Sequence, residues 1–169
     1  MGVAVLKTLF AAAMDTPLGE VRLVASEAGL RAVLWNCHEP ERAPFGGARI
    51  VEEPTPVLDE AAGQLEEYFA HERTVFDLPL DLVGTPFQQT AWSILRQIPY
   101  GETITYGEQA RRLGDVKATR AVGAANGRNP LSVIVPCHRV IGADGKLVGF
   151  AGGLDTKAWL LAHERHTLF

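Results

Sequence analysis

The sequence predicts an α+β protein in two parts: a first half with a small antiparallel sheet and a helix, and a helical second half of the helix-turn-helix type. Two observations predict it. Strand-like apolar segments between turn residues fill the first half, whereas helix-start signals and apolar stripes of helical spacing fill the second. The expected linker is the segment 76–84, which contains Pro79, and we divide the chain into domains 1–83 and 84–169.

The first half contains three predicted strands and one helix. Residues 3–14 and 21–26 have strand-like patterns on either side of a turn at 16–19, and residues 30–35 make a third strand. Residues 36–54 are rich in proline, glycine and charge, which predicts an irregular loop. A helix is expected over 56–71, where the apolar residues repeat at helical spacing: Leu58, Ala61, Ala62, Leu65 and Phe69.

The second half is marked by helix signals. Residues 85–88, Thr-Pro-Phe-Gln, form a capping box with proline at the first helical position, and this helix should end by Pro99. Residues 105–108 form a second capping box, which opens a short helix ending at Gly114. A third helix should span about 117–125. Two short helices joined by a turn that contains glycine are typical of a helix-turn-helix.

Charge is distributed unevenly between the halves. Residues 1–83 carry 6 Lys/Arg and 14 Asp/Glu, a net charge of −8, whereas residues 84–169 carry 10 and 6, a net charge of +4. This asymmetry is expected when only one domain contacts phosphates, although solvated charge also segregates by chance. Two cysteines and no apolar run near the ~18 residues of a membrane span predict an intracellular protein without a disulfide framework.

The third predicted helix has small side chains: Ala118, Ala121, Gly123, Ala124 and Ala125. Few of them can reach base edges with hydrogen bonds, so the helix does not look like a reader of the major groove. Composition leaves two alternatives open. The helix is either packed tightly in a core or able to bring its backbone very close to another surface.

Residues 136–140, Pro-Cys-His-Arg-Val, place a thiol beside an imidazole. A thiol becomes a strong nucleophile as the thiolate, and a nearby base is the usual means of forming one near neutral pH. The alternative is a small buried cysteine beside an unrelated histidine. In an extended strand Cys137 and His138 would point to opposite faces, so their pairing would need a water or a bend.

Five further motifs occur in order around this one: Gly-Thr-Pro-Phe-Gln at 84–88, Ile-Pro-Tyr-Gly-Glu-Thr at 98–103, Arg-Ala-Val-Gly at 120–123, Gly-Phe-Ala-Gly-Gly-Leu at 149–154 and Leu-Leu-Ala-His-Glu at 160–164. Together they resemble the O6-alkylguanine-DNA alkyltransferases, the methylated-DNA–protein-cysteine S-methyltransferases. The likeness is specific from about 84 to 164 and loose before it. It implies a ribonuclease H-like first domain and a winged-helix-like second domain.

The resemblance also implies roles for the residues that match its motifs. Cys137 corresponds to the alkyl acceptor, and His138 to the imidazole that takes its proton through a water. Glu164 corresponds to the carboxylate that orients and charges this imidazole. Asn129 corresponds to the residue that braces the turn before the cysteine strand, and Tyr106 to a phenol that helps to protonate the extruded guanine.

The implied DNA contacts lie on the third helix and around the pocket. Arg120 would fill the gap left by the flipped nucleotide, while the small residues of the helix would enter the minor groove. The carbonyls of Cys137 and Val140 would hold the guanine amino group. The remaining implied DNA- and base-binding residues are Ala121, Gly123, Ala124, Ser132, which replaces the proline of some relatives and bears on bulky inhibitors, and Ala151, whose N–H would face O6.

The expected function is direct reversal of O6-alkylguanine, and to a lesser degree O4-alkylthymine, in double-stranded DNA, by one irreversible transfer to Cys137. No cofactor is expected, and no metal, because the first domain offers only Cys37, His38 and His71 where a four-coordinate zinc site needs more ligands. We expect a monomer without membrane association, in the cytoplasm, or in the nucleus of a eukaryote. The rivals are a damage-sensing DNA-binding module without chemistry and a Cys-His hydrolase.

Overall fold

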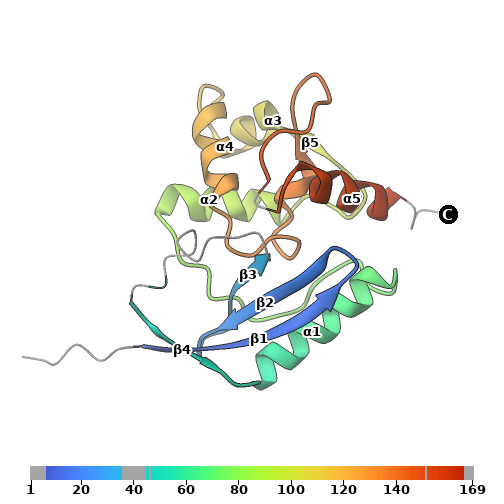
Figure 1. The fold of residues 1–169 in the computed structure, drawn as a ribbon. Coiled ribbons are helices and arrows are strands. Elements are labelled where there is room, and N and C mark those ends of the chain that lie inside the picture. The colour runs from blue at the N-terminus through green and yellow to red at the C-terminus, as the bar shows by residue number, and fades with distance from the viewer. Residues whose placement is uncertain (1–6, 36–44, 46, 151, 166–169) are drawn as a thin grey trace, which may run out of the picture. The chain divides into compact units, whose positions relative to one another are not determined.

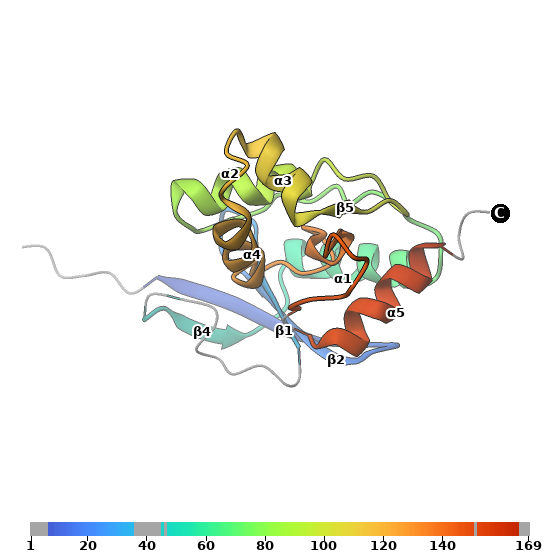
Figure 2. The ribbon, with the colours of Figure 1, turned by 90° about the horizontal axis from the view of Figure 1, so that it is seen from above.

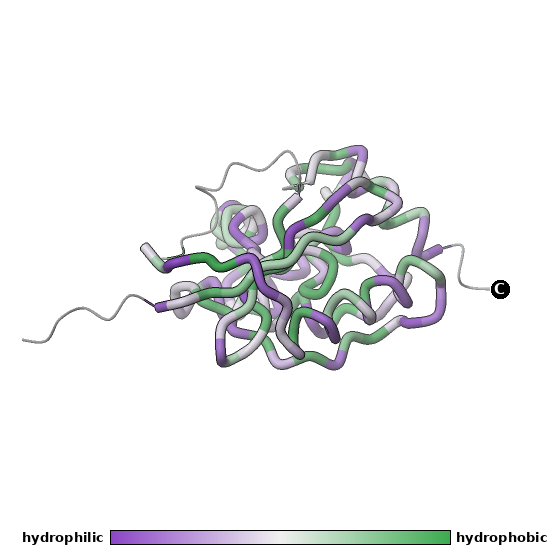
Figure 3. Tube along the Cα trace, turned by 60° about the horizontal axis from the view of Figure 1, so that its bottom comes forward, coloured by the Kyte–Doolittle hydropathy of each residue, from purple (hydrophilic) through white to green (hydrophobic). Residues whose placement is uncertain are grey.

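The computed structural model describes residues 7–35, 45, 47–150 and 152–165 of the 169-residue chain. The chain forms two compact units, residues 1–82 and 83–169, and each is described by itself (Figure 1). Along the trace, apolar stretches alternate with hydrophilic residues, as expected for elements that bury one face (Figure 3).

The first unit is a four-stranded sheet with one helix against it. Strands β1 (Thr8–Thr16), β2 (Gly19–Ala25) and β3 (Leu30–Trp35) are antiparallel neighbours, as predicted, and the order in the sheet is β3-β2-β1-β4. Helix α1 (Pro56–Phe69) packs against these three strands through its buried stripe (Figure 2). Thr55 caps the helix by accepting a hydrogen bond from the Leu58 amide.

The segment 36–54 was predicted as an irregular loop, and in part this is wrong. Residues 36–44 lie outside the described residues, but Arg49–Glu52 forms strand β4, which pairs in parallel with β1. Four residues with charges at both ends give no alternation to detect, so only the pairing with β1 defines this strand.

Part of the predicted linker is also paired within the first unit. The Leu30 amide donates to the Pro79 carbonyl (2.9 Å), and the Asp81 amide donates to the Leu30 carbonyl (2.8 Å). Gly29 permits this approach, because its φ is +154° and a Cβ there would lie 2.5 Å from the Pro79 oxygen. The backbone up to Asp81 is therefore held by β3.

The second unit is helical. It contains α2 (Pro86–Leu95), α3 (Tyr106–Leu113), α4 (Thr119–Gly127) and α5 (Leu154–Arg165), with a short parallel pair of β5 (Ile104–Thr105) and β6 (Val140–Ile141). Both hydrogen bonds of the capping box are present: the Thr85 side chain accepts from the Gln88 amide, and the Gln88 side chain accepts from the Thr85 amide. At α3 the structure differs: Thr105 caps the Glu108 amide, but the Glu108 carboxylate is bound by Arg111 and Arg112.

Helices α3 and α4 form the predicted helix-turn-helix, with Gly114 at φ +99° ending α3. Buried polar contacts fix how α4 sits. Gln109 and Asn126 exchange two amide hydrogen bonds of 2.9 and 2.8 Å, and the Trp92 indole N–H donates to the Ala125 carbonyl at 2.8 Å. These bonds hold α4 against α2 and α3, and leave its other face to solvent.

Candidate active site

Cys137 lies on a single 3-10 turn, η2 (Cys137–Arg139), which follows Pro136 and leads into β6. The sequence allowed an extended segment here, in which Cys137 and His138 would need a water or a bend to pair; the structure has a turn instead. On a 3-10 turn consecutive side chains are about 120° apart, so Cys137 and His138 do not point to opposite faces. Only 7% of the Cys137 surface is exposed.

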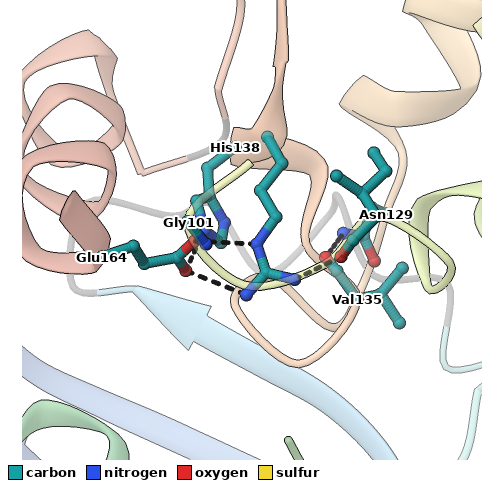
Figure 4. Close-up of polar contacts among 7 residues, drawn as sticks. Gly101, Asn129, Val135, His138 and Glu164 are labelled. Atoms are coloured by element: carbon teal, nitrogen blue, oxygen red, sulfur yellow. Dashed lines mark hydrogen bonds and ion pairs between the residues drawn. The ribbon is translucent and has the colours of Figure 1, made fainter. Parts of the chain in front are cut away.

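His138 meets Glu164 although 26 residues separate them. The His138 Nε2 and Glu164 Oε2 atoms lie 2.6 Å apart, and both side chains are buried (Figure 4). Because an ionised carboxylate only accepts hydrogen bonds, Nε2 carries the proton of the neutral ring. Nδ1 is then the acceptor, and it is buried without a hydrogen-bond partner among the described residues. This nitrogen is the free basic group of the pair.

The pKa values of the pair follow from burial and from the charges around it. Burial alone would raise the pKa of Glu164, but the hydrogen bond from His138, then the hydrogen bonds and charge of Arg139, hold that pKa well below its ordinary range. Burial lowers the pKa of His138, more than the hydrogen bond and charge of Glu164 raise it. The resting pair is therefore a carboxylate and a neutral imidazole.

Asn129 links the end of α4 to the segment before Cys137. Its Nδ2 donates to the Val135 carbonyl at 2.8 Å, and its Oδ1 accepts from the Leu131 amide at 2.9 Å (Figure 4). Between them Val133 has φ +77°, which is strained for a β-branched residue. Ser132 is buried on the same turn. These contacts brace the turn before Cys137, and the part in alkyl transfer that the resemblance implies for Asn129 stays a prediction.

The Cys137 thiol is protonated at rest. Burial raises its pKa, and hydrogen bonds from Asn129 and Ser132, together with the positive charge of Lys157, oppose this shift only in part. The thiolate must therefore form during the reaction, rather than stand ready in the free protein.

The sequence did not lead us to predict a role for Lys157, which is fully buried in the second unit. Its Nζ donates to the carbonyls of Val140 (2.7 Å) and Val148 (2.9 Å) and lies 3.4 Å from the Tyr106 hydroxyl. Tyr106 itself donates to the Val148 carbonyl at 2.9 Å, and burial, followed by the negative charge that Cys137 carries once ionised, raises its pKa. The Val140 carbonyl, expected to hold the guanine amino group, thus already accepts one hydrogen bond.

A signal for Lys157 was present in the sequence. With Leu160, Leu161 and Glu164 it occupies positions i, i+3, i+4 and i+7 of one helical stripe, and all four are buried on α5. Charged residues at core positions of a helix are expensive unless paired, so such positions point to a functional site.

Alkylation of Cys137 by iodoacetamide should accelerate as pH rises through a range above that of an exposed cysteine, because burial favours the neutral thiol. Lys157→Met should move the profile to still higher pH, since it removes a charge that favours the thiolate. Lys146→Met, which removes an exposed lysine, should not. Intact mass in a Cys37→Ser background follows the reaction, and full reactivity at mildly acidic pH would contradict a resting thiol.

Helix α4 combines the two alternatives that composition left open. Val122, Ala125 and Asn126 are buried, whereas Arg120, Ala121 and Ala124 are exposed: these are the two faces of one helix. Gly123 is partly buried, and a Cβ there would lie 3.9 Å from the Tyr106 ring. The exposed face of α4 therefore presents one long basic side chain, Arg120, among small ones.

Other expectations fall partly outside the structure. Ala151, Cys37 and His38 lie outside the described residues. Within those residues, His71 included, no three His, Cys, Asp or Glu side chains gather where they could hold a metal ion. None of the helices described is both long and apolar enough to cross a membrane.

Two family models match this chain. Residues 9–82 match the ribonuclease-like domain of 6-O-methylguanine DNA methyltransferase, and residues 86–166 match its DNA binding domain. Methylated-DNA–protein-cysteine methyltransferases from Methanosarcina acetivorans and Mycobacterium leprae are 46% and 48% identical over 162 residues each. These alignments cover 92% and 90% of this chain and 98% and 90% of those proteins.

Solved structures agree with these matches. The O6-methylguanine methyltransferase of Mycobacterium tuberculosis is 43% identical, with a TM-score of 0.83 and 95% of each chain covered. The crystal structure of the OGT of the same organism in complex with DNA is 43% identical, with the same TM-score and 94% of each chain covered.

Proposed function

The chain belongs to the 6-O-methylguanine DNA methyltransferase family, and we propose that it repairs O6-alkylguanine in DNA by transferring the alkyl group irreversibly to Cys137. The observation that carries this proposal is the buried Cys137 on one turn with His138, whose Nε2 is held by Glu164 and whose Nδ1 remains basic. A damage-sensing module would have no use for this relay.

The chemistry is a displacement at the alkyl carbon. With the damaged base out of the stack, Cys137 gives its proton through a water to Nδ1 of His138, and the sulfur attacks the alkyl carbon as the bond to O6 breaks. Glu164 stabilises the imidazolium that forms. Guanine leaves with the electron pair and takes a proton from Tyr106, whose oxygen lies beside the Lys157 ammonium. The thioether is a poor leaving group, so each molecule acts once.

The exposed face of α4 is the proposed DNA-binding surface. Its small residues, Ala121, Gly123 and Ala124, allow close approach to the minor groove, and Arg120 is the side chain long enough to fill the space left by the flipped nucleotide. O4-alkylthymine is the poorer substrate. We further propose that the protein acts as a monomer and without a cofactor. Its proposed location is the cytoplasm, where the thiol stays reduced.

The product in the DNA tests this function. After incubation with a duplex that contains O6-methylguanine, the digested oligonucleotide should contain guanine at that position, with its backbone and glycosidic bond intact. Unchanged O6-methylguanine with tight binding would support the damage-sensing rival. Conversion by a trace of protein, with many turnovers, would support a hydrolase.

Arg120→Ala should slow repair of duplex DNA by about tenfold or more. Flipping a stacked base costs a few kcal/mol, and the Arg120 side chain, by filling the space that the base leaves, offsets part of this cost. Reaction with free O6-benzylguanine, which needs no flipping, should be unchanged. Arg128→Ala is the control: it removes an exposed arginine beyond the other end of α4, and so it separates the loss of a positive charge from the loss of the side chain that fills the gap. Equal slowing of both reactions by Arg120→Ala would remove Arg120 from base flipping.

A further inference from the structure

Arg139 makes more contacts with the proposed relay than any role assigned above explains. It is the last residue of the turn that carries Cys137 and His138, and only 7% of its side chain is exposed. Its Nε donates to Glu164 Oε1 (2.8 Å) and its Nη2 to Glu164 Oε2 (3.1 Å), while Nη1 donates to the Ile98 carbonyl (2.7 Å). Its guanidinium also lies over the Tyr100 ring, 5.6 Å from the centroid.

These contacts fill the acceptor positions of Glu164. Oε1 accepts from Arg139 and from the Gly101 amide (3.3 Å), and Oε2 accepts from His138 and again from Arg139 (Figure 4). A carboxylate has about four lone-pair sites, so little room remains for a proton. A forked guanidinium contact also sets the plane of the carboxylate, which a single ammonium contact does not.

We propose that Arg139 is a positioning residue for alkyl transfer: its fork holds Glu164 as an anion in one orientation, so that Glu164 fixes the His138 ring and never takes the proton itself. The proton released by Cys137 then stops at His138. This inference rests on the proposed function for its purpose. The state of Glu164, however, is measurable on the thiol without DNA.

Charged groups from two elements act on this cluster. His138 and Arg139, both from η2, lower the pKa of Glu164. Lys157, from the same helix as Glu164, acts on His138 and Cys137. From the turn before β5, the Gly101 N–H and the Ile98 carbonyl reach the cluster, and the Tyr100 ring lies against Arg139. Removal of Arg139 therefore takes away the guanidinium that contacts both oxygens of the buried Glu164 carboxylate.

The test is the pH profile of Cys137 alkylation by iodoacetamide in a Cys37→Ser background. Arg139→Met should lower the rate, by roughly 10²-fold at the acid end, where Glu164 now takes up a proton and no longer supports the imidazolium. The deficit should shrink as pH rises and Glu164 ionises. Arg165→Met, which removes the exposed arginine next to Glu164 on α5, should leave the profile unchanged.

A double variant separates positioning from packing. In a Glu164→Gln background, Arg139→Met should add no pH-dependent change, because no titrating carboxyl remains. A deficit that is constant with pH, or the same pH-dependent deficit in both backgrounds, would overturn the proposal. If Arg139→Met does not fold, Arg139→Lys carries the test. Lysine keeps the positive charge but not the forked contact, so the alkylation rate should fall less, with the same dependence on pH. A loss of rate that is constant with pH would again overturn the proposal.

If iodoacetamide gives the predicted profiles while O6-methylguanine in DNA remains unchanged, Arg139 acts as inferred and the proposed function fails. If repair proceeds while the Arg139→Met deficit is constant with pH, the function stands and this inference fails.

Discussion

Cys137→Ser abolishes alkyl transfer while binding of damaged DNA persists: this is the largest effect that we expect. A neutral hydroxyl is a far poorer nucleophile than a thiolate toward an alkyl carbon, and His138 cannot make an alkoxide at neutral pH. The side chains proposed to bind DNA, Arg120 and Tyr106, are unchanged. The measurement is methyl transfer from a labelled duplex, with a gel-shift assay for binding.

Cys37→Ser is the matched control for this variant, since it removes the other cysteine of the chain. It should behave as the wild type. Transfer that survives in Cys137→Ser, or that is lost in Cys37→Ser, would place the acceptor elsewhere.

His138→Phe should slow alkyl transfer by about 10²–10⁴-fold near neutral pH, the usual contribution of general acid–base catalysis. Phenylalanine keeps a planar ring, although a larger one, and Glu164 retains its bonds to Arg139, so the fold should persist. Because the thiol can still ionise by itself, the variant should regain rate at high pH. Single-turnover rates across pH make the comparison.

His71→Asn provides the control for histidine loss. His71 is exposed in the first unit and has φ +63°, a conformation that asparagine tolerates. Its rate should follow the wild type at every pH. A His138→Phe profile parallel to that of the wild type would mean that His138 does not take the thiol proton.

Local signals predicted the frame of this fold. The strand of residues 30–35 and the capped start at Thr85 lie where the sequence placed them. Both depend on neighbours within a few residues, namely an apolar run that follows a turn and side-chain capping of a helix. Strand β4 escaped detection because its only support is a partner strand some 40 residues away.

Local signals were not enough to predict the relay of Cys137, His138 and Glu164. The helical stripe that Glu164 shares with Leu160 and Leu161 marks a core position, but it does not name a partner, and the pairing with His138 exists only after folding. The family resemblance suggested the pair, whereas the contacts of Arg139 and Lys157 came from the structure alone. Both are buried cations whose partners are largely backbone carbonyls or a distant carboxylate, and such partners leave no pattern in the sequence.

The measurement that tests the central claim most directly is the intact mass of the protein after reaction with excess duplex containing O6-methylguanine. The account predicts that every molecule gains the mass of one methylene and then stops, and that peptide mapping places the adduct on Cys137 and leaves Cys37 unmodified. Continued repair by protein of unchanged mass, or an adduct on any residue other than Cys137, would contradict it.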